Sequence, residues 1–300
     1  MKVTVVPPFD FAQSLESLNG FAPCAGDHYC ERERLVTGGF VEELPFVAHV
    51  TAQNGEPERL SVDVRWIDDP GEEAAVAEWL SAFLSLDDDL TALYEAARDD
   101  PPFERIVQGL RGFHHVRFPT PFEAACWAAL SQRTPMSLAK QQKQALVEVC
   151  GRIVEDGDQE ISLFPTPRMV RAAEPAVRET IGNERKAKTL LGATELFADE
   201  PLGELTDEVL LTRLADIWGF GEWSSEFVFL RGFGRLTRVP STEHRLRKAV
   251  ADVYELDGAE ASDSDLAQLS ERYAPMKGYW AYYVRAWAFR REVDTAPIAN

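Results

Sequence analysis

A change of hydrophobic period near residue 67 constrains the fold more than any other feature of this sequence. Before it, apolar and polar residues alternate, with many Val, Thr and Phe, in three segments: 3–7, 34–53 and 58–66. A period of two predicts half-buried antiparallel strands. After it, apolar residues recur at helical spacing through most of the chain. We therefore expect an α+β fold, with a small N-terminal antiparallel β domain over residues 1–67 and an all-α bundle over residues 68–300.

Turn and cap residues punctuate both parts. Gly38-Gly39 and Asn54-Gly55 predict breaks between strands, because these residues accept turn conformations readily. Thr120-Pro121 and Thr206-Asp207 are typical of helix starts, since a threonine hydroxyl can accept from a free backbone amide and proline is tolerated in the first turn.

The composition excludes several classes of protein. Apolar content of 45% and charged content of 27% are typical of a globular protein. No apolar run resembles a signal peptide or is long enough to cross a membrane. Four cysteines fit neither a zinc site nor an iron–sulfur ligand run, so we expect reduced thiols in a cytoplasmic protein: Cys24, Cys30, Cys126 and Cys150.

The net charge of −19 argues against nucleic acid, yet the charge is uneven. From Asp68 to Asp100 there are eleven acidic residues and one basic residue. From Gly232 to Val250 there are five basic residues and His244, and the one acidic residue is Glu243. A second basic group contains Arg185, Lys186 and Lys188. This asymmetry favours an acidic back and a local basic face, although each run alone is compatible with a solvated helix face.

Residues 206–232 are typical of a helix, a tight turn and a second helix. Gly219 and Gly221 would allow positive φ and a close approach of the backbone. Free amides at the start of the second helix would then form an anion site suited to a DNA phosphate. A lone G-x-G is weak evidence, but here a basic segment and an acid at the start of another helix follow it.

Several segments together resemble one family. IWGFGEWSSEFVFLRGFG is similar to a hairpin followed by a W-[ST]-A-[EN]-x-x-x-L-R helix, with Ser225 in place of Ala, and VPSTEHRLRKAV is similar to a segment that carries a catalytic acid. IGNERKAKTLLGATELF, YAPMKGYWAYYVRAW and ALSQRTPMSLAKQQ give weaker support. The family is the helix-hairpin-helix DNA glycosylases, within them the 3-methyladenine DNA glycosylase II type.

The resemblance implies that the protein excises a damaged base after flipping its nucleotide into a pocket. By position Glu243 would be the catalytic carboxylate, where the family usually has Asp. Glutamate is one methylene longer, and an offset of about 1 Å can cost about a hundredfold in rate. Without the family, a helix N-terminal acid favoured by the helix dipole is the simpler interpretation of Glu243.

Residue 223 bears on the type of reaction. Bifunctional relatives carry a Schiff-base lysine there, and Trp223 in its place implies a monofunctional glycosylase without lyase activity. Trp223 and Phe227 would stack on a cationic flipped base, with His244 and Tyr283 as weaker pocket candidates. Ordinary core packing explains the Trp223–Phe227 spacing equally well.

The resemblance also implies a set of contacts to double-stranded DNA that contains damaged bases. Arg133 stands where relatives place a wedge that fills the gap left by the flipped nucleotide, or it is simply a surface arginine. The predicted DNA-contacting residues are Gln132, Arg133, Gly219, Gly221, Arg245 and Arg247. No cofactor or iron–sulfur cluster is expected; a Na or K ion at backbone carbonyls near Ile217 would leave no side-chain signature.

Two alternatives remain open at this point. The first is a helix-hairpin-helix DNA-binding protein that has weak or lost excision, favoured by Glu243 and by the acidic net charge. The second is a glycosylase of another lesion specificity, such as oxidised guanine. For the main hypothesis we expect a monomer without membrane association, in the cytoplasm and associated with the nucleoid.

Overall fold

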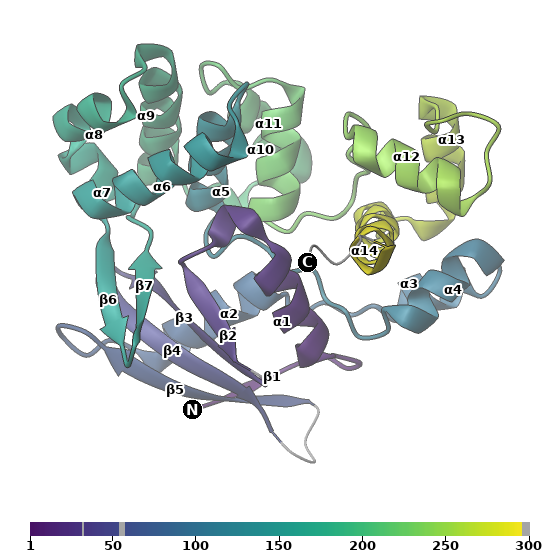
Figure 1. Ribbon diagram of the computed structural model, residues 1–300, viewed down its shortest axis with the longest axis horizontal. Helices are drawn as coiled ribbons and strands as arrows, with labels where there is room; N and C mark the ends of the chain where they lie inside the picture. Colours follow the sequence, from purple (N-terminus) through teal and green to yellow (C-terminus); the bar gives the residue numbers. More distant parts are fainter. Residues whose placement is uncertain (32, 54–57, 296–300) are drawn as a thin grey trace.

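An antiparallel five-stranded sheet forms the base of the molecule (Figure 1). The computed structural model describes residues 1–31, 33–53 and 58–295. The strand order is β1-β5-β4-β3-β2, and every neighbouring pair is antiparallel. The strands are β1 (Lys2–Thr4), β2 (His28–Glu31), β3 (Arg34–Val41), β4 (Leu44–Ala52) and β5 (Arg59–Trp66). The predicted strand segments are therefore confirmed.

Both faces of this sheet are covered at β3 and β4. On one face Phe46 packs edge-on against Trp79 of helix α2 (Glu73–Leu84), with ring centroids 5.2 Å apart. On the other face Val36 and Val47 join a small buried cluster with side chains of a separate hairpin. Because neither face meets water, alternation along β4 divides its side chains between two packed layers.

The predicted strand break at Gly38-Gly39 is wrong. Both glycines lie inside β3, and the chain turns at Glu42-Glu43, where φ is +51° and +66°. A Cβ on Gly38 would lie 2.6 Å from Leu163 Cδ2 and 2.5 Å from a backbone oxygen, so the glycine allows two layers to approach closely. The second predicted break, Asn54-Gly55, lies outside the described residues.

Within residues 68–295, a two-stranded hairpin departs from the all-α bundle predicted for residues 68–300. The hairpin β6 (Arg152–Asp156) and β7 (Gln159–Leu163) forms a two-stranded sheet that packs on β3. Its turn holds Gly157 at φ +63°. The Asp156 carboxylate of this hairpin accepts hydrogen bonds from Tyr29 at 2.7 Å and from Arg65 at 3.1 Å, and so ties the hairpin to the sheet.

The helices form two groups above the sheet, α5–α11 on the left of Figure 1 and α12–α14 with α3 and α4 on the right. Helix α1 (Phe11–Gly20) belongs to the N-terminal region, where none was predicted. The others are α3 (Thr91–Ala97), α4 (Pro101–Gly109), α5 (Pro121–Ser131), α6 (Met136–Cys150), α7 (Pro167–Ala172), α8 (Glu174–Ile181), α9 (Glu184–Asp199), α10 (Asp207–Ala215), α11 (Glu222–Phe227), α12 (His244–Val253), α13 (Asp263–Ser270) and α14 (Lys277–Thr295).

The predicted helix starts are found, and one of them is capped as expected. The Thr120 hydroxyl accepts from the Glu123 amide at 3.1 Å, whereas Thr206 occupies the N-cap of α10 without a side-chain bond. A single large core runs from the sheet through α2 to Trp280 in α14, so residues of both predicted domains share it. Among the described helices, none combines the length and apolar content needed to cross a bilayer.

Candidate functional site

The turn between α10 and α11 requires glycine at one of its two glycine positions. Gly219 has φ +87°, and a Cβ there would lie 2.5 Å from Thr189 Oγ1. Gly221 has φ −120°, so the expected positive φ is wrong for this residue, and a Cβ added there would meet no atom within 4 Å. Gly221 thus opens onto free space at the start of α11, where backbone amides lack helical partners.

Gln132 joins the loop after α5 to this hairpin. Its Nε2 donates to the Gly219 carbonyl at 3.0 Å and to Ser224 Oγ at 3.1 Å. The next residue, Arg133, is exposed and has φ +50°, an uncommon conformation for a side chain of its size. The structure therefore brings two of the three predicted DNA-contacting segments together.

Lys186, which the sequence placed in a basic surface group, instead supports this loop from behind. Its Nζ donates to the Leu130 carbonyl at 2.6 Å, to Gln142 Oε1 at 3.1 Å and to the Thr134 hydroxyl. Burial lowers the pKa of Lys186. The side chain satisfies the carbonyl end of α5 and is a support for the loop rather than part of an open basic patch.

Large exposed apolar side chains gather around the same loop and hairpin, and the sequence reasoning did not single them out. Met136 and Leu138, at the start of α6, are 52% and 44% exposed. Trp218, on the hairpin, is 42% exposed and carries Lys188 Nζ 4.2 Å from its ring centroid. Exposed apolar groups flanked by cations are suited to a partner that has both a charged backbone and flat bases.

Trp223 and Phe227 stack on one another as their spacing predicts, with centroids 5.2 Å apart and planes inclined by 22°. Their surroundings differ. Trp223 is 41% exposed, whereas Phe227 packs edge-on against Phe118 at 5.6 Å. Tyr283 is fully buried, and its hydroxyl lies 3.0 Å from that of Tyr94. Tyr283 is therefore a core residue in this structure, and of the two stacked aromatics Trp223 is the more exposed.

Glu243 occupies the N-cap of α12, and its side chain makes no cap hydrogen bond. It is 37% exposed, and its Oε1 accepts from Arg285 Nε at 3.2 Å. Arg285 lies on α14 and is 20% exposed. The N-cap position agrees with the simpler interpretation of Glu243 as a helix N-terminal acid favoured by the helix dipole. The hydrogen-bond partner of its side chain, Arg285, was missed by sequence reasoning.

The basic residues around Glu243 do not act alike. Arg247 donates to the backbone carbonyls of Ser241 and Ala261, each at 2.7 Å, so it braces the segment that carries the acid. Arg245 is exposed. His244 is 84% exposed, and its Nδ1 lies 3.2 Å from Glu260 Oε2. Among the described residues, it contacts neither Trp223, Phe227 nor Tyr283.

A second carboxyl group, Glu226, connects α11 to the acid-bearing segment. Burial raises the pKa of Glu226, the nearby Glu222 raises it further, and Arg238 and a hydrogen bond with Thr242 oppose the shift. Its Oε2 is buried and has no partner among the described residues. Glu226 therefore lies near Arg238 and Thr242, which precede Glu243 in the chain.

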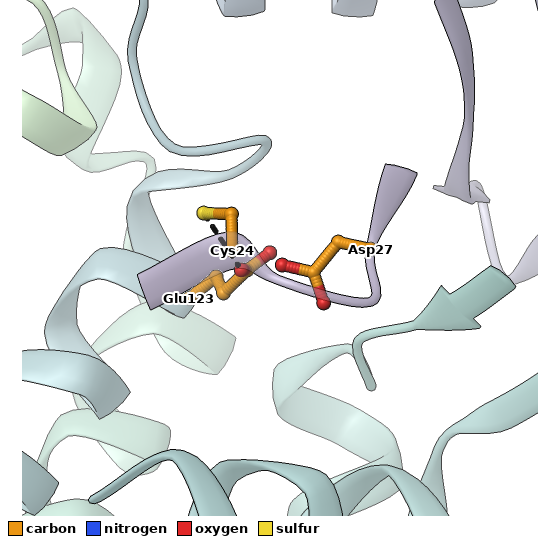
Figure 2. A group of neighbouring side chains, drawn as sticks. All are labelled: Cys24, Asp27 and Glu123. Atoms are coloured by element: carbon orange, nitrogen blue, oxygen red, sulfur yellow. Dashed lines mark hydrogen bonds between the residues drawn. The ribbon is translucent and has the colours of Figure 1, made fainter. Parts of the chain in front are cut away.

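A buried cluster at the start of α5 has the composition of a metal site. Cys24, Asp27 and Glu123 place one ligand atom each within 4.8 Å of one another (Figure 2). However, Lys143 Nζ lies 2.5 Å from Asp27 and 2.7 Å from Glu123. An ammonium group already contacts both carboxyl groups, and a metal cation would have to displace it, so we assign the cluster a structural role.

No family model matches the chain. A DNA-3-methyladenine glycosylase of Bacillus subtilis (strain 168) is 24% identical over 218 residues, which cover 70% of this chain and 71% of the relative.

Solved structures resemble the chain over nearly its whole length. A 3-methyladenine DNA-glycosylase from Archaeoglobus fulgidus covers 99% of this chain and 100% of its own, with a TM-score of 0.79 and 17% identity. An 8-oxoguanine glycosylase/lyase of Clostridium acetobutylicum in complex with double-stranded DNA covers 95% and 93%, with a TM-score of 0.68 and 17% identity. The chain therefore has the fold that these proteins share, which includes the N-terminal β region and the α10–α11 hairpin.

Proposed function

We propose that this chain, which has the fold and the motifs of the helix-hairpin-helix DNA glycosylases, is a monofunctional DNA glycosylase that excises alkylated bases in base excision repair. The observation that carries the proposal is the arrangement around α11. Three groups contribute to it: the half-exposed carboxylate of Glu243, the exposed Trp223, and the turn at Gly221, which is open to solvent. An acid for the sugar, an aromatic for the base and an amide turn for a phosphate are the groups that this reaction uses.

The chemistry suits a single carboxylate. An N-alkylated purine carries positive charge, so its glycosidic bond is weakened and the base leaves without a strong general acid. Glu243 would then stabilise the positive charge that develops on the sugar and orient the attacking water. Trp223 would offer an electron-rich face to the cationic base. Phe227 supports Trp223 from behind through the stack described above.

The absence of lyase chemistry is part of this proposal. The side chain of Trp223 cannot form a Schiff base, and the nearby Lys186 is held by three internal acceptors. We expect borohydride treatment on a duplex with an abasic site to trap no covalent adduct. An adduct would show that another lysine serves as nucleophile, and the monofunctional assignment would be withdrawn.

DNA binding is expected to centre on the hairpin and the loop after α5. Gly221 and the exposed Arg245 would contact phosphates, and Arg133 would fill the gap left by the flipped nucleotide. Gly219 shapes the turn, and Gln132 and Arg247 are already bonded within the protein, so we propose that they act by holding the turn and the acid segment in place.

A monovalent cation near Ile217 also remains a proposal. The Ile217 carbonyl accepts from the Phe220 amide at 2.9 Å, which engages one of its two lone pairs and leaves the other for an ion. Titration of DNA binding with KCl and NaCl at constant ionic strength would reveal a specific ion requirement.

One observation favours the second candidate, a DNA-binding protein without excision: the carboxylate of Glu243 is already paired with Arg285. Incubation with methylated duplex DNA, followed by detection of released bases, separates the two. Release of 3-methyladenine is the expected result, and binding without release would favour the second candidate. We also propose a monomer associated with the nucleoid in the cytoplasm, which sedimentation and localisation would test.

A further inference from the structure

We infer that Arg285 is a positioning residue for Glu243, and that the chain carries glutamate there because only the longer side chain reaches this arginine. The inference rests on the proposed function, since it assigns a role within the same reaction. It concerns two residues that lie 42 positions apart and meet only through the packing of α12 on α14.

The backbone that carries Glu243 is held on two sides. Arg247 donates to the Ser241 carbonyl at 2.7 Å, and the Glu243 amide donates to the Pro240 carbonyl at 3.2 Å. Neither contact restrains the Glu243 side chain, which has three rotatable bonds. A carboxylate that samples several rotamers loses the preorganisation on which electrostatic stabilisation of a transition state depends.

Arg285 removes that freedom. Its side chain is four-fifths buried and projects from a long helix, so it is itself well fixed. The bond engages Oε1 of Glu243 through Nε at 3.2 Å and leaves Oε2 outside that bond. One oxygen is thereby anchored to the protein while the other serves the reaction.

The distance explains the residue type. An aspartate at 243 would withdraw the carboxylate by about 1 Å, and a contact now 3.2 Å long would exceed the range of a hydrogen bond. The glutamate and the arginine therefore form a matched pair. The extra methylene of Glu243 adds a rotatable bond, and Arg285 restrains the carboxylate at the end of the side chain.

Four proteins test this inference: wild type, Arg285→Leu, Glu243→Asp and the double variant. We expect each single change to slow single-turnover release of methylated bases by about a hundredfold, because each frees or displaces the same carboxylate. The double variant should be about as slow as either single variant, since the second change removes an interaction that the first has already broken. Affinity for an abasic duplex should stay within about twofold of wild type, and Arg285→Lys should restore part of the rate.

Arg290→Leu is the matched control. Arg290 lies on the same helix and is paired with Glu16 at 2.9 Å, away from the acid-bearing segment. We expect it to leave both rate and affinity unchanged. Side-chain NMR of 15N-labelled arginine adds a measurement independent of catalysis: exchange of the Arg285 Nε–H with water should accelerate in Glu243→Asp.

Three results would overturn the inference: a wild-type rate in Arg285→Leu, a double variant slower by the product of both losses, or an Arg285 Nε–H that Glu243→Asp leaves unchanged. A wild-type protein that releases no base contradicts the proposed function itself and removes the positioning role with it. An active wild type with a fully active Arg285→Leu overturns only the present inference.

Discussion

Two glutamates in this protein face a basic partner under opposite conditions. Glu123 is 1% exposed and lies 2.7 Å from Lys143, which is itself 6% exposed. Glu243 is 37% exposed and lies 3.2 Å from Arg285. The first pair joins α5 to α6, and the second lies at the candidate site. The two pairs differ mainly in burial, and the buried cation also contacts a second carboxyl group, that of Asp27.

Burial changes what the cation does. Burial raises the pKa of Glu123 to about 8 despite Lys143. Burial lowers the pKa of Lys143, but Asp27 and Glu123 outweigh it and the pKa rises above its ordinary value. One positive charge thus meets two carboxyl groups, of which Glu123 holds a proton at neutral pH. In the buried pair the cation mainly compensates the charge of the carboxyl groups. In the half-exposed pair Arg285 mainly fixes the orientation of the Glu243 carboxylate.

Removing the buried cation should have the largest effect. In Lys143→Met, Asp27 would remain buried without a countercharge, and breaking a buried pair in this way typically costs about 3–5 kcal/mol. We expect urea unfolding to show a loss of that size. Lys140→Met, on the same helix, is the control and should cost little. A loss below about 1 kcal/mol in Lys143→Met would mean that water or a counterion reaches the cluster.

The next effect concerns catalysis alone. Glu243→Gln keeps the shape of the side chain and removes its charge, so base release should fall by about a hundredfold, equivalent to about 2.7 kcal/mol. Its unfolding free energy and its affinity for an abasic duplex should stay close to wild type, because the side chain is half-exposed. Excision by this variant at the wild-type rate would leave Glu243 no part in the reaction.

The third effect is a pH dependence of stability. The pKa of Glu123 is raised in the fold from an ordinary value of 4.5 to about 8. Its contribution to stability is therefore fully present below about pH 4.5 and is lost as the pH rises through about 8. One such group gives a slope of at most about 1.4 kcal/mol per pH unit.

Glu123→Gln isolates this term, because an amide cannot lose a proton in that range. Urea unfolding of both proteins between pH 5 and 9 should show a steeper decline for wild type. Parallel curves would indicate that Glu123 titrates normally and that the cluster is wetter than its burial implies.

The smallest effect belongs to an exposed pair. Arg290 is paired with Glu16, whose side chain is 62% exposed, and such pairs contribute about 0–1 kcal/mol. Arg290→Leu should therefore change the unfolding free energy by less than about 1 kcal/mol. A larger loss would point to the stacking of Arg290 over Phe113, where the cation lies 5.6 Å from the ring centroid.

The fold class was predictable because hydrophobic period is a local property. Residues 34–53 alternate, and the helical segments after residue 67 repeat at helical spacing, so each element could be recognised alone. The β6–β7 hairpin was missed although its two-residue loop, Gly157-Asp158, has a common hairpin sequence. Gly38 was misread as a strand break. Glycine is needed there because Leu163 packs close to the backbone, and Leu163 lies 125 residues further along the chain.

The site was predictable only where sequence position carries the information. The hairpin helix and the place of Glu243 followed from motifs. Lys186 looked like surface charge, and only the structure shows that its ammonium group caps the end of α5. Arg285 carries no local signal, since its partner lies on another helix. Side-chain direction and long-range pairing depend on packing, which a linear pattern does not encode.

The hairpin β6–β7 has a consequence for the order in which the protein is made. Val36 and Val47 are buried against Ile161 and Leu163. On the ribosome, the first five strands emerge well before this cover does, at about 5–20 residues per second. For several seconds the nascent sheet therefore presents an apolar face to water. The face is closed only once Leu163 has left the exit tunnel, and a chain stalled before that point would be a target for chaperones.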